Sequence, residues 1–67
     1  MEQIKRFLKL RLVQERTGLG KSTIYRMANE GSFPKPLKLG PRASAWLESD
    51  ITAWIDSKIE ENSHAAV

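Results

Sequence analysis

The chain has 67 residues, with 11 Lys/Arg, 8 Asp/Glu, no cysteine and a formal net charge of +3. This length predicts a single domain over residues 1–67, ordered at about 7–61 and followed by a tail at 62–67. The lack of cysteine excludes disulfides and zinc–thiolate sites, and no apolar run is long enough to cross a bilayer. We therefore expect a small cytoplasmic protein with no membrane partner.

The charge is divided unevenly along the chain. Residues 1–42 carry ten Lys/Arg against three Asp/Glu, whereas residues 43–67 carry one against five. A basic segment of this kind favours a polyanionic partner. Ordinary solvated surface charge explains the imbalance about equally well, so charge alone does not identify the function.

The first elements in chain order are a short extended segment and a short helix. Residues 7–10 alternate as a strand or an extended lead-in does. A helix of about residues 11–17 follows, and Gly18 ends it because glycine adopts the left-handed conformation without steric cost. Three residues of this helix have the spacing of one partly buried face: Leu12, Val13 and Arg16.

A second helix is predicted from its N-cap Gly20 to Gly31. Leu19 and Ile24 have the spacing of a hydrophobic staple, which fixes the angle at which the chain enters the helix. The inner face comprises Ile24, Met27 and Ala28. The turn between the two helices has three or four residues and contains glycine, as in a helix-turn-helix.

The segment Thr17–Arg26 fits two motifs. Gly20-Lys21-Ser22 resembles the end of a phosphate-binding loop, but that motif needs a glycine where this chain has Glu15. It also needs a buried strand in a parallel sheet, which 67 residues cannot supply. In the other motif, Lys21 begins a helix that enters the DNA major groove. We therefore interpret the segment as a helix-turn-helix.

The second half of the chain predicts a β-hairpin and a third helix. The segments 37–39 and 43–47 alternate around a turn at 40–42, which gives a hairpin of about five residues a side. Ser49 is a favourable N-cap for the third helix. That helix carries an amphipathic stripe of Ile51, Trp54, Ile55 and Ile59. The fold class predicted is mainly α with a small β-hairpin wing, a winged helix-turn-helix.

The candidate DNA-binding residues fall into two groups. Those at the start of the second helix are Lys21, Ser22, Thr23, Tyr25 and Arg26, and those of the wing are Lys35, Lys38 and Arg42. We expect Arg26 and Ser22 to read base edges and Lys21 and Tyr25 to contact the DNA backbone. The wing cations are expected to bind phosphates and set register more than sequence preference.

Several aromatic and polar residues have a structural alternative. Tyr25 fits a half-buried core aromatic as well as it fits a DNA contact. For Thr23, bonding to the local backbone is the more frequent role. Trp46 and Trp54 have apolar neighbours, so we expect them to pack in the core and not to stack on bases.

Catalytic chemistry is poorly supported. The one histidine, His64, lies in the expected tail with no partner by pattern, so neither a general base nor a metal ligand is indicated. We predict that the protein is not an enzyme and uses no cofactor, metal or small-molecule ligand.

The chain resembles the AlpA family of small regulators encoded by phages and genomic islands, which are related to excisionase-type and MerR-like winged-helix proteins. The residues that carry the resemblance span about 8–59: Thr17-Gly18-Leu19, Ser22–Arg26, Gly31–Pro34, Leu37–Gly40, Arg42, Ala45-Trp46 and Asp50–Ile55. One departure is Gly20, where the family commonly has Ser or another capping residue.

The resemblance implies a sequence-specific double-stranded DNA-binding transcriptional regulator of a prophage or mobile element, acting on integrase or excision genes. Two alternatives remain: an excisionase-type architectural factor that bends DNA, and a protein-interaction module that docks a recombinase. We interpret the fold as a monomeric domain. Because so small a monomer makes few base contacts, we expect high-affinity binding only at repeated or paired sites, through a homodimer or a cooperative oligomer on DNA. The operator and the sign of regulation do not follow from the sequence.

Overall fold

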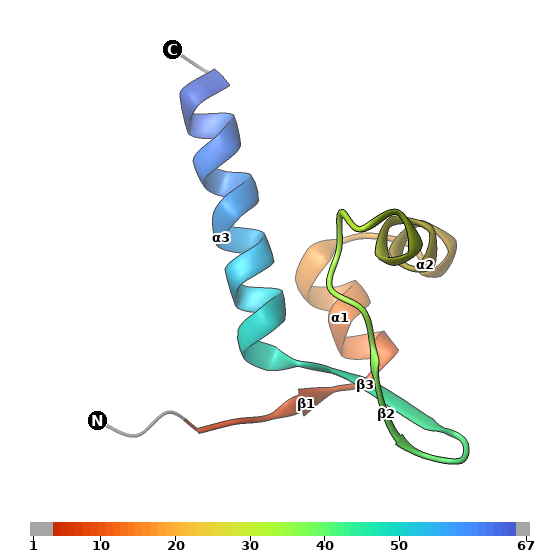
Figure 1. Ribbon diagram of the computed structural model, residues 1–67. Helices are drawn as coiled ribbons and strands as arrows, with labels where there is room; N and C mark the ends of the chain where they lie inside the picture. The colour runs from red at the N-terminus through yellow and green to blue at the C-terminus, as the bar shows by residue number, and fades with distance from the viewer. Residues whose placement is uncertain (1–3, 66–67) are drawn as a thin grey trace.

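The computed structural model describes residues 4–65, with side chains described for residues 4–63. Within this part, the chain forms three helices and a small antiparallel sheet of three strands (Figure 1). The elements in chain order are β1 (Phe7–Leu8), α1 (Leu10–Thr17), α2 (Lys21–Glu30), β2 (Leu37–Gly40), β3 (Ala43–Leu47) and α3 (Glu48–Ala65). The mainly α winged helix-turn-helix expected from the sequence is confirmed.

The turn between α1 and α2 has the expected glycine chemistry. Gly18 has a φ of 76°, in the left-handed region, and its N–H donates to the Gln14 carbonyl at 2.7 Å. Gly20 is extended, as an N-cap must be, and Gly31 closes α2 with a φ of 86°. No strand precedes this turn directly, which agrees with rejecting the phosphate-loop interpretation.

The sheet has the strand order β1-β3-β2, so β3 lies in the middle. Leu8 of β1 pairs with Trp46, and Leu37 of β2 pairs with Ala45. The register shifts between Lys38 and Gly40, where the β2 edge is irregular. The sequence predicts a wing of two strands, β2 and β3. In the structure β1 pairs with β3 and adds a third strand.

The core draws on all three helices, on strands β1 and β3, and on the segment between α2 and β2. Six apolar residues are at most 4% exposed and form one cluster: Leu8, Val13, Ile24, Phe33, Trp46 and Ile51. Five partly buried residues surround it: Leu10, Leu19, Met27, Trp54 and Ile55. The predicted inner faces of α2 and α3 are therefore correct from Ile24 to Ala28 and from Ile51 to Ile55.

Two predicted burial patterns are wrong in part. In α1 only Val13 is buried. Leu12 is 40% exposed, and Arg16 is exposed because its guanidinium extends to Thr52 of α3. In α3 the stripe ends at Ile55, and Ile59 is 59% exposed because it lies past the last layer of the body.

The bounds of α3 also differ from the prediction. The helix begins at Glu48, so Ser49 lies in its first turn and is not the N-cap. The start of α3 is fixed by the segment that precedes β1, since the Glu48 N–H donates to the Arg6 carbonyl at 2.8 Å. The helix continues to Ala65, so residues 62–65 are helical and not a tail. Residues 66 and 67 lie outside the described part.

Candidate nucleic-acid interface

The outer edge of α2 presents polar and basic side chains in a fixed orientation. Ile24 is fully buried and Ala28 is 3% exposed, so the helix is held from behind by the core. Four of the five predicted contact residues on α2 are exposed: Lys21, Ser22, Tyr25 and Arg26. Thr23 is partly buried at the side of the helix. The predicted division of α2 into an inner and an outer face is therefore confirmed, whereas DNA contact by these residues stays a prediction.

The N-terminus of α2 is electropositive. Its first turn contains no acidic residue and begins with Lys21, and the cap Gly20 offers no side-chain acceptor to the free N–H groups. A helix N-terminus carries a partial positive charge and unpaired donors, both of which favour an anionic group such as a phosphate.

Arg26 forms an ion pair in the free protein. Its Nη1 lies 3.5 Å from Glu30 Oε2, one helical turn further on, and both side chains are mostly exposed. Exposed pairs with this spacing contribute about 0.3–0.5 kcal/mol. The pair is therefore weak enough for Arg26 to exchange it for another hydrogen-bond acceptor.

Tyr25 has the structural role that the sequence allowed. Its ring centroid lies 5.9 Å from that of Trp46, the planes are inclined by 55°, and the residue is 38% exposed. The ring therefore packs on the core aromatic while part of the side chain faces solvent. This arrangement confirms the half-buried aromatic and leaves a backbone contact with DNA as a prediction.

The wing carries the second group of cations. Lys35 precedes β2, Lys38 lies on β2 opposite Ser44, and Arg42 lies in the turn at the hairpin tip. All three are exposed, and none forms an ion pair with another described residue. By contrast, Arg6 pairs with Glu48, and Arg11 with Glu15. The wing cations are therefore available to bind anions.

Two hydrogen bonds that the sequence did not indicate hold the segment between α2 and the wing. The Trp46 indole N–H donates to the Pro34 carbonyl, and that of Trp54 donates to the Ser32 carbonyl, each at 2.8 Å. The buried Phe33 ring packs edge-on against Trp54, with centroids 4.8 Å apart. The pattern placed both tryptophans in the core, but it did not show that they fasten this loop.

The two groups of candidate residues lie on separate elements. The α2 residues share one helix, and Lys38 and Arg42 share one hairpin. In Figure 1, α2 and the hairpin tip both lie on the side of the molecule away from α3. The pinned segment 32–34 joins the groups, so α2 and the wing are held at a fixed separation.

The described residues show no grouping typical of a metal site. No cluster of three or more His, Asp or Glu residues occurs among them. The side chain of His64 lies outside the described part, so nothing is concluded about it. No helix in this part is both long and apolar enough to span a membrane.

Comparison with known proteins identifies relatives over most of the chain. The model of the prophage CP4-57 regulatory protein (AlpA) family matches residues 6–59. The "Uncharacterized protein ORF88" of Enterobacteria phage P4 is 42% identical over 55 residues, which are 82% of this chain and 62% of that protein. The "DNA-binding transcriptional activator AlpA" of Escherichia coli K12 is 32% identical over 59 residues, 79% of this chain and 84% of that one. No solved structure matches the chain significantly.

Proposed function

The chain belongs to the AlpA family of prophage regulatory proteins, and on that premise we propose that it is a sequence-specific double-stranded DNA-binding transcriptional regulator. We further propose that it acts in the cytoplasm on integrase or excision genes of a prophage or another mobile element. The observation that carries the proposal is the outer edge of α2, where Lys21, Ser22 and Arg26 face solvent while Ile24 fixes the helix in the core.

The proposed contacts follow the chemistry of each side chain. Arg26 can form a bidentate pair with guanine, and Ser22 can reach a neighbouring base edge. Lys21 lies at the electropositive helix start, where it favours a phosphate. Tyr25 is assigned a backbone contact through the exposed part of its side chain. Lys35, Lys38 and Arg42 bind phosphates from the wing and add salt-dependent affinity.

The test is a titration of the protein against its own upstream region and against a scrambled duplex of the same composition. We expect tighter binding to the natural sequence and a strong loss of affinity with added salt. Lys5→Ala provides a control, since it removes one positive charge from an exposed residue outside both groups of candidate contacts and should leave DNA binding unchanged. Equal affinity for both duplexes would contradict sequence-specific regulation, and no binding at low salt would favour a protein-interaction module.

A second candidate function, DNA bending, is favoured by the apolar wing. Leu37 and Leu39 are 45% and 46% exposed and lie on either side of Lys38. Apolar side chains on minor-groove proteins can wedge between base steps and bend the duplex. In a fluorescence assay on end-labelled attachment-site DNA, an architectural factor would bring the ends closer, and Leu39→Ala would reduce the bend more than the affinity. An unchanged end-to-end distance would exclude this role.

A further inference from the structure

Helix α3 extends well past the body of the domain. Its 18 residues give a length of about 27 Å, yet only its first turns pack against the core, through Ile51, Trp54 and Ile55. Figure 1 shows the remaining turns projecting away from α1 and the sheet. Ile51, Ile55 and Ile59 share one face at four-residue spacing, and burial falls along it from complete at Ile51 to 59% exposure at Ile59.

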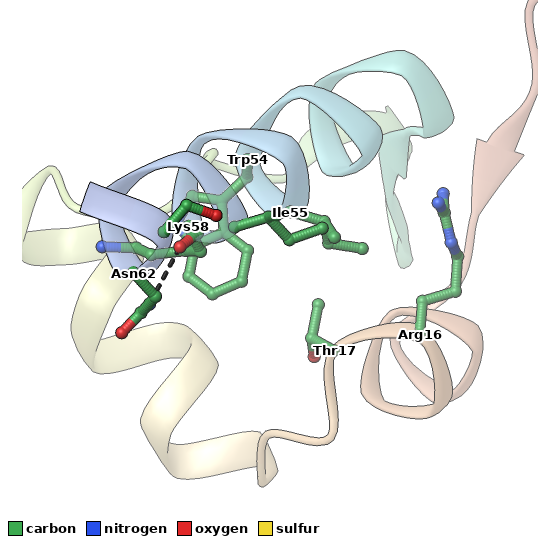
Figure 2. Close-up of a pocket in the computed structure, with 8 residues that line it drawn as sticks. Arg16, Thr17, Trp54, Ile55, Lys58 and Asn62 are labelled. Carbon is green, nitrogen blue, oxygen red and sulfur yellow. Dashed lines mark hydrogen bonds between the residues drawn. The ribbon is translucent and has the colours of Figure 1, made fainter. Parts of the chain in front are cut away.

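An apolar groove lies where this stripe leaves the core. Arg16 and Thr17 of α1 form one side, and α3 forms the other with Trp54, Ile55, Lys58, Ile59, Asn62 and Ser63 (Figure 2). The described residues that line it include two cations and no carboxylate. Lys58 already pairs with the neighbouring Glu61 at 3.3 Å, whereas Arg16 has no carboxylate partner among the described residues. An occupant should therefore offer apolar side chains at helical spacing together with acidic neighbours.

Helix α3 itself has this chemistry. Asp56 and Glu60 directly follow Ile55 and Ile59, so each apolar residue has an acidic neighbour. Thr52, Asp56 and Glu60 lie at four-residue spacing along one flank of the helix. The guanidinium of Arg16 already binds this flank, since its Nη1 donates to Thr52 Oγ1 at 3.1 Å. Arg16 thus lies at the Thr52 end of this flank, and the carboxylates of Asp56 and Glu60 lie toward its C-terminal end.

We propose that the groove receives α3 of a second copy of this chain, packed antiparallel in a two-fold dimer. Antiparallel packing brings the Glu60 end of one helix beside Arg16 of the partner, and two-fold symmetry makes the same contact twice. Ile55 and Ile59 of both helices are then covered by each other. The residues that line the groove include none of the candidate DNA-binding residues of α2 or the wing.

The proposal is tested without DNA, so its failure would leave the proposed DNA-binding role untouched. Because the contact involves only a few helical turns per copy, we expect dimerisation in the micromolar range. Sedimentation equilibrium of the full chain should give twice the monomer mass of 7.6 kDa at high concentration. A mass that stays monomeric up to about 0.5 mM would overturn the proposal.

Two matched variants identify the surface. Ile59→Glu should weaken association by about tenfold or more, because a carboxylate replaces an apolar contact. Ile4→Glu makes the same change at a residue that is 84% exposed and lies outside the groove, and it should have no effect. Both positions are exposed, so circular dichroism should show folded proteins. Equal dimerisation by Ile59→Glu and wild type would overturn the assignment.

A charge exchange tests the antiparallel pairing. Arg16→Glu should weaken the dimer because it places like charges beside the partner's acidic flank. The double variant Arg16→Glu/Glu60→Arg restores opposite charges and should recover most of the affinity. A double variant weaker than Arg16→Glu alone would contradict the antiparallel register.

Discussion

Replacing Gly20 with serine should stabilise the domain. Gly20 is the N-cap of α2, with φ −79° and ψ 164°, a conformation that any L-residue adopts. It makes no side-chain cap bond, and an added Cβ would meet no atom within 4 Å. A serine hydroxyl at this position can accept the N–H of Ser22 or Thr23, which has no intrahelical partner.

The magnitude follows from two contributions. Serine is better than glycine at an N-cap by a few tenths of a kcal/mol. Removing glycine from a position with ordinary dihedral angles adds about 0.4–1 kcal/mol by restricting the unfolded chain. The free energy of unfolding should therefore rise by about 1 kcal/mol, which for a domain of this size raises the melting temperature by about 4–8 °C.

Thermal unfolding followed by far-ultraviolet circular dichroism measures this change. Gly18→Ser is the matched control, because Gly18 has a φ of 76° and the same substitution there introduces left-handed strain. We expect that control to lower stability by about 1 kcal/mol. An unchanged or lower melting temperature for Gly20→Ser would refute the reasoning, as would equal shifts for both variants.

Three further predictions concern recognition and the pinned loop. Arg26→Ala should cost about 1–3 kcal/mol on the specific site and relax discrimination, measured on native and base-substituted duplexes; an equal loss on random DNA would contradict its role. Lys38→Ala should weaken all sequences alike and lower the slope of log K against log[salt] by about one, and an unchanged slope would exclude a phosphate contact. Trp54→Phe removes the donor to the Ser32 carbonyl and should lower the free energy of unfolding by about 0.5–1.5 kcal/mol in urea denaturation. No measurable loss would mean that water replaces that bond.

Local chemistry made most of the fold predictable. Gly18 and Gly31 end α1 and α2 because the C-cap of each helix adopts a positive φ, which glycine tolerates. Gly20 is the N-cap of α2, as its position before the apolar pattern predicts. The buried face of α2 follows from the spacing of Ile24 and Ala28. The helix caps and the buried face of α2 depend on residues within one helical turn of each other, so their pattern can be read from the sequence.

The features that the sequence did not predict depend on contacts between segments distant in sequence. The stripe of α3 predicts burial of Ile59, but periodicity does not show where the rest of the body ends. The start of α3 at Glu48 is held by the carbonyl of Arg6, just before β1 and 42 positions earlier in the chain. Likewise, the bonds from Trp46 and Trp54 to the loop at 32–34 depend on how three elements pack together.

In the candidate site, too, the sequence predicts which residues face outward but not what they contact. Outward placement of Lys21, Ser22 and Arg26 followed from the spacing of the inner-face residues Ile24, Met27 and Ala28. The ion pair of Arg26 with Glu30 is visible in the spacing too, although only the structure shows that it forms. The contacts proposed for these side chains involve a second molecule, so their geometry does not follow from the sequence of this one.

The pairing of Leu8 with Trp46 has a consequence for how the domain folds. All residues proposed to contact DNA lie in the loop that this pair closes. Closing a loop of this length costs about 3 kcal/mol of chain entropy, whereas α1, α2 and the hairpin form through near neighbours. The first strand is thus expected to join late in folding and to detach early in unfolding. Substitutions in residues 4–8 should therefore tune the lifetime of the folded state without altering the chemistry of recognition.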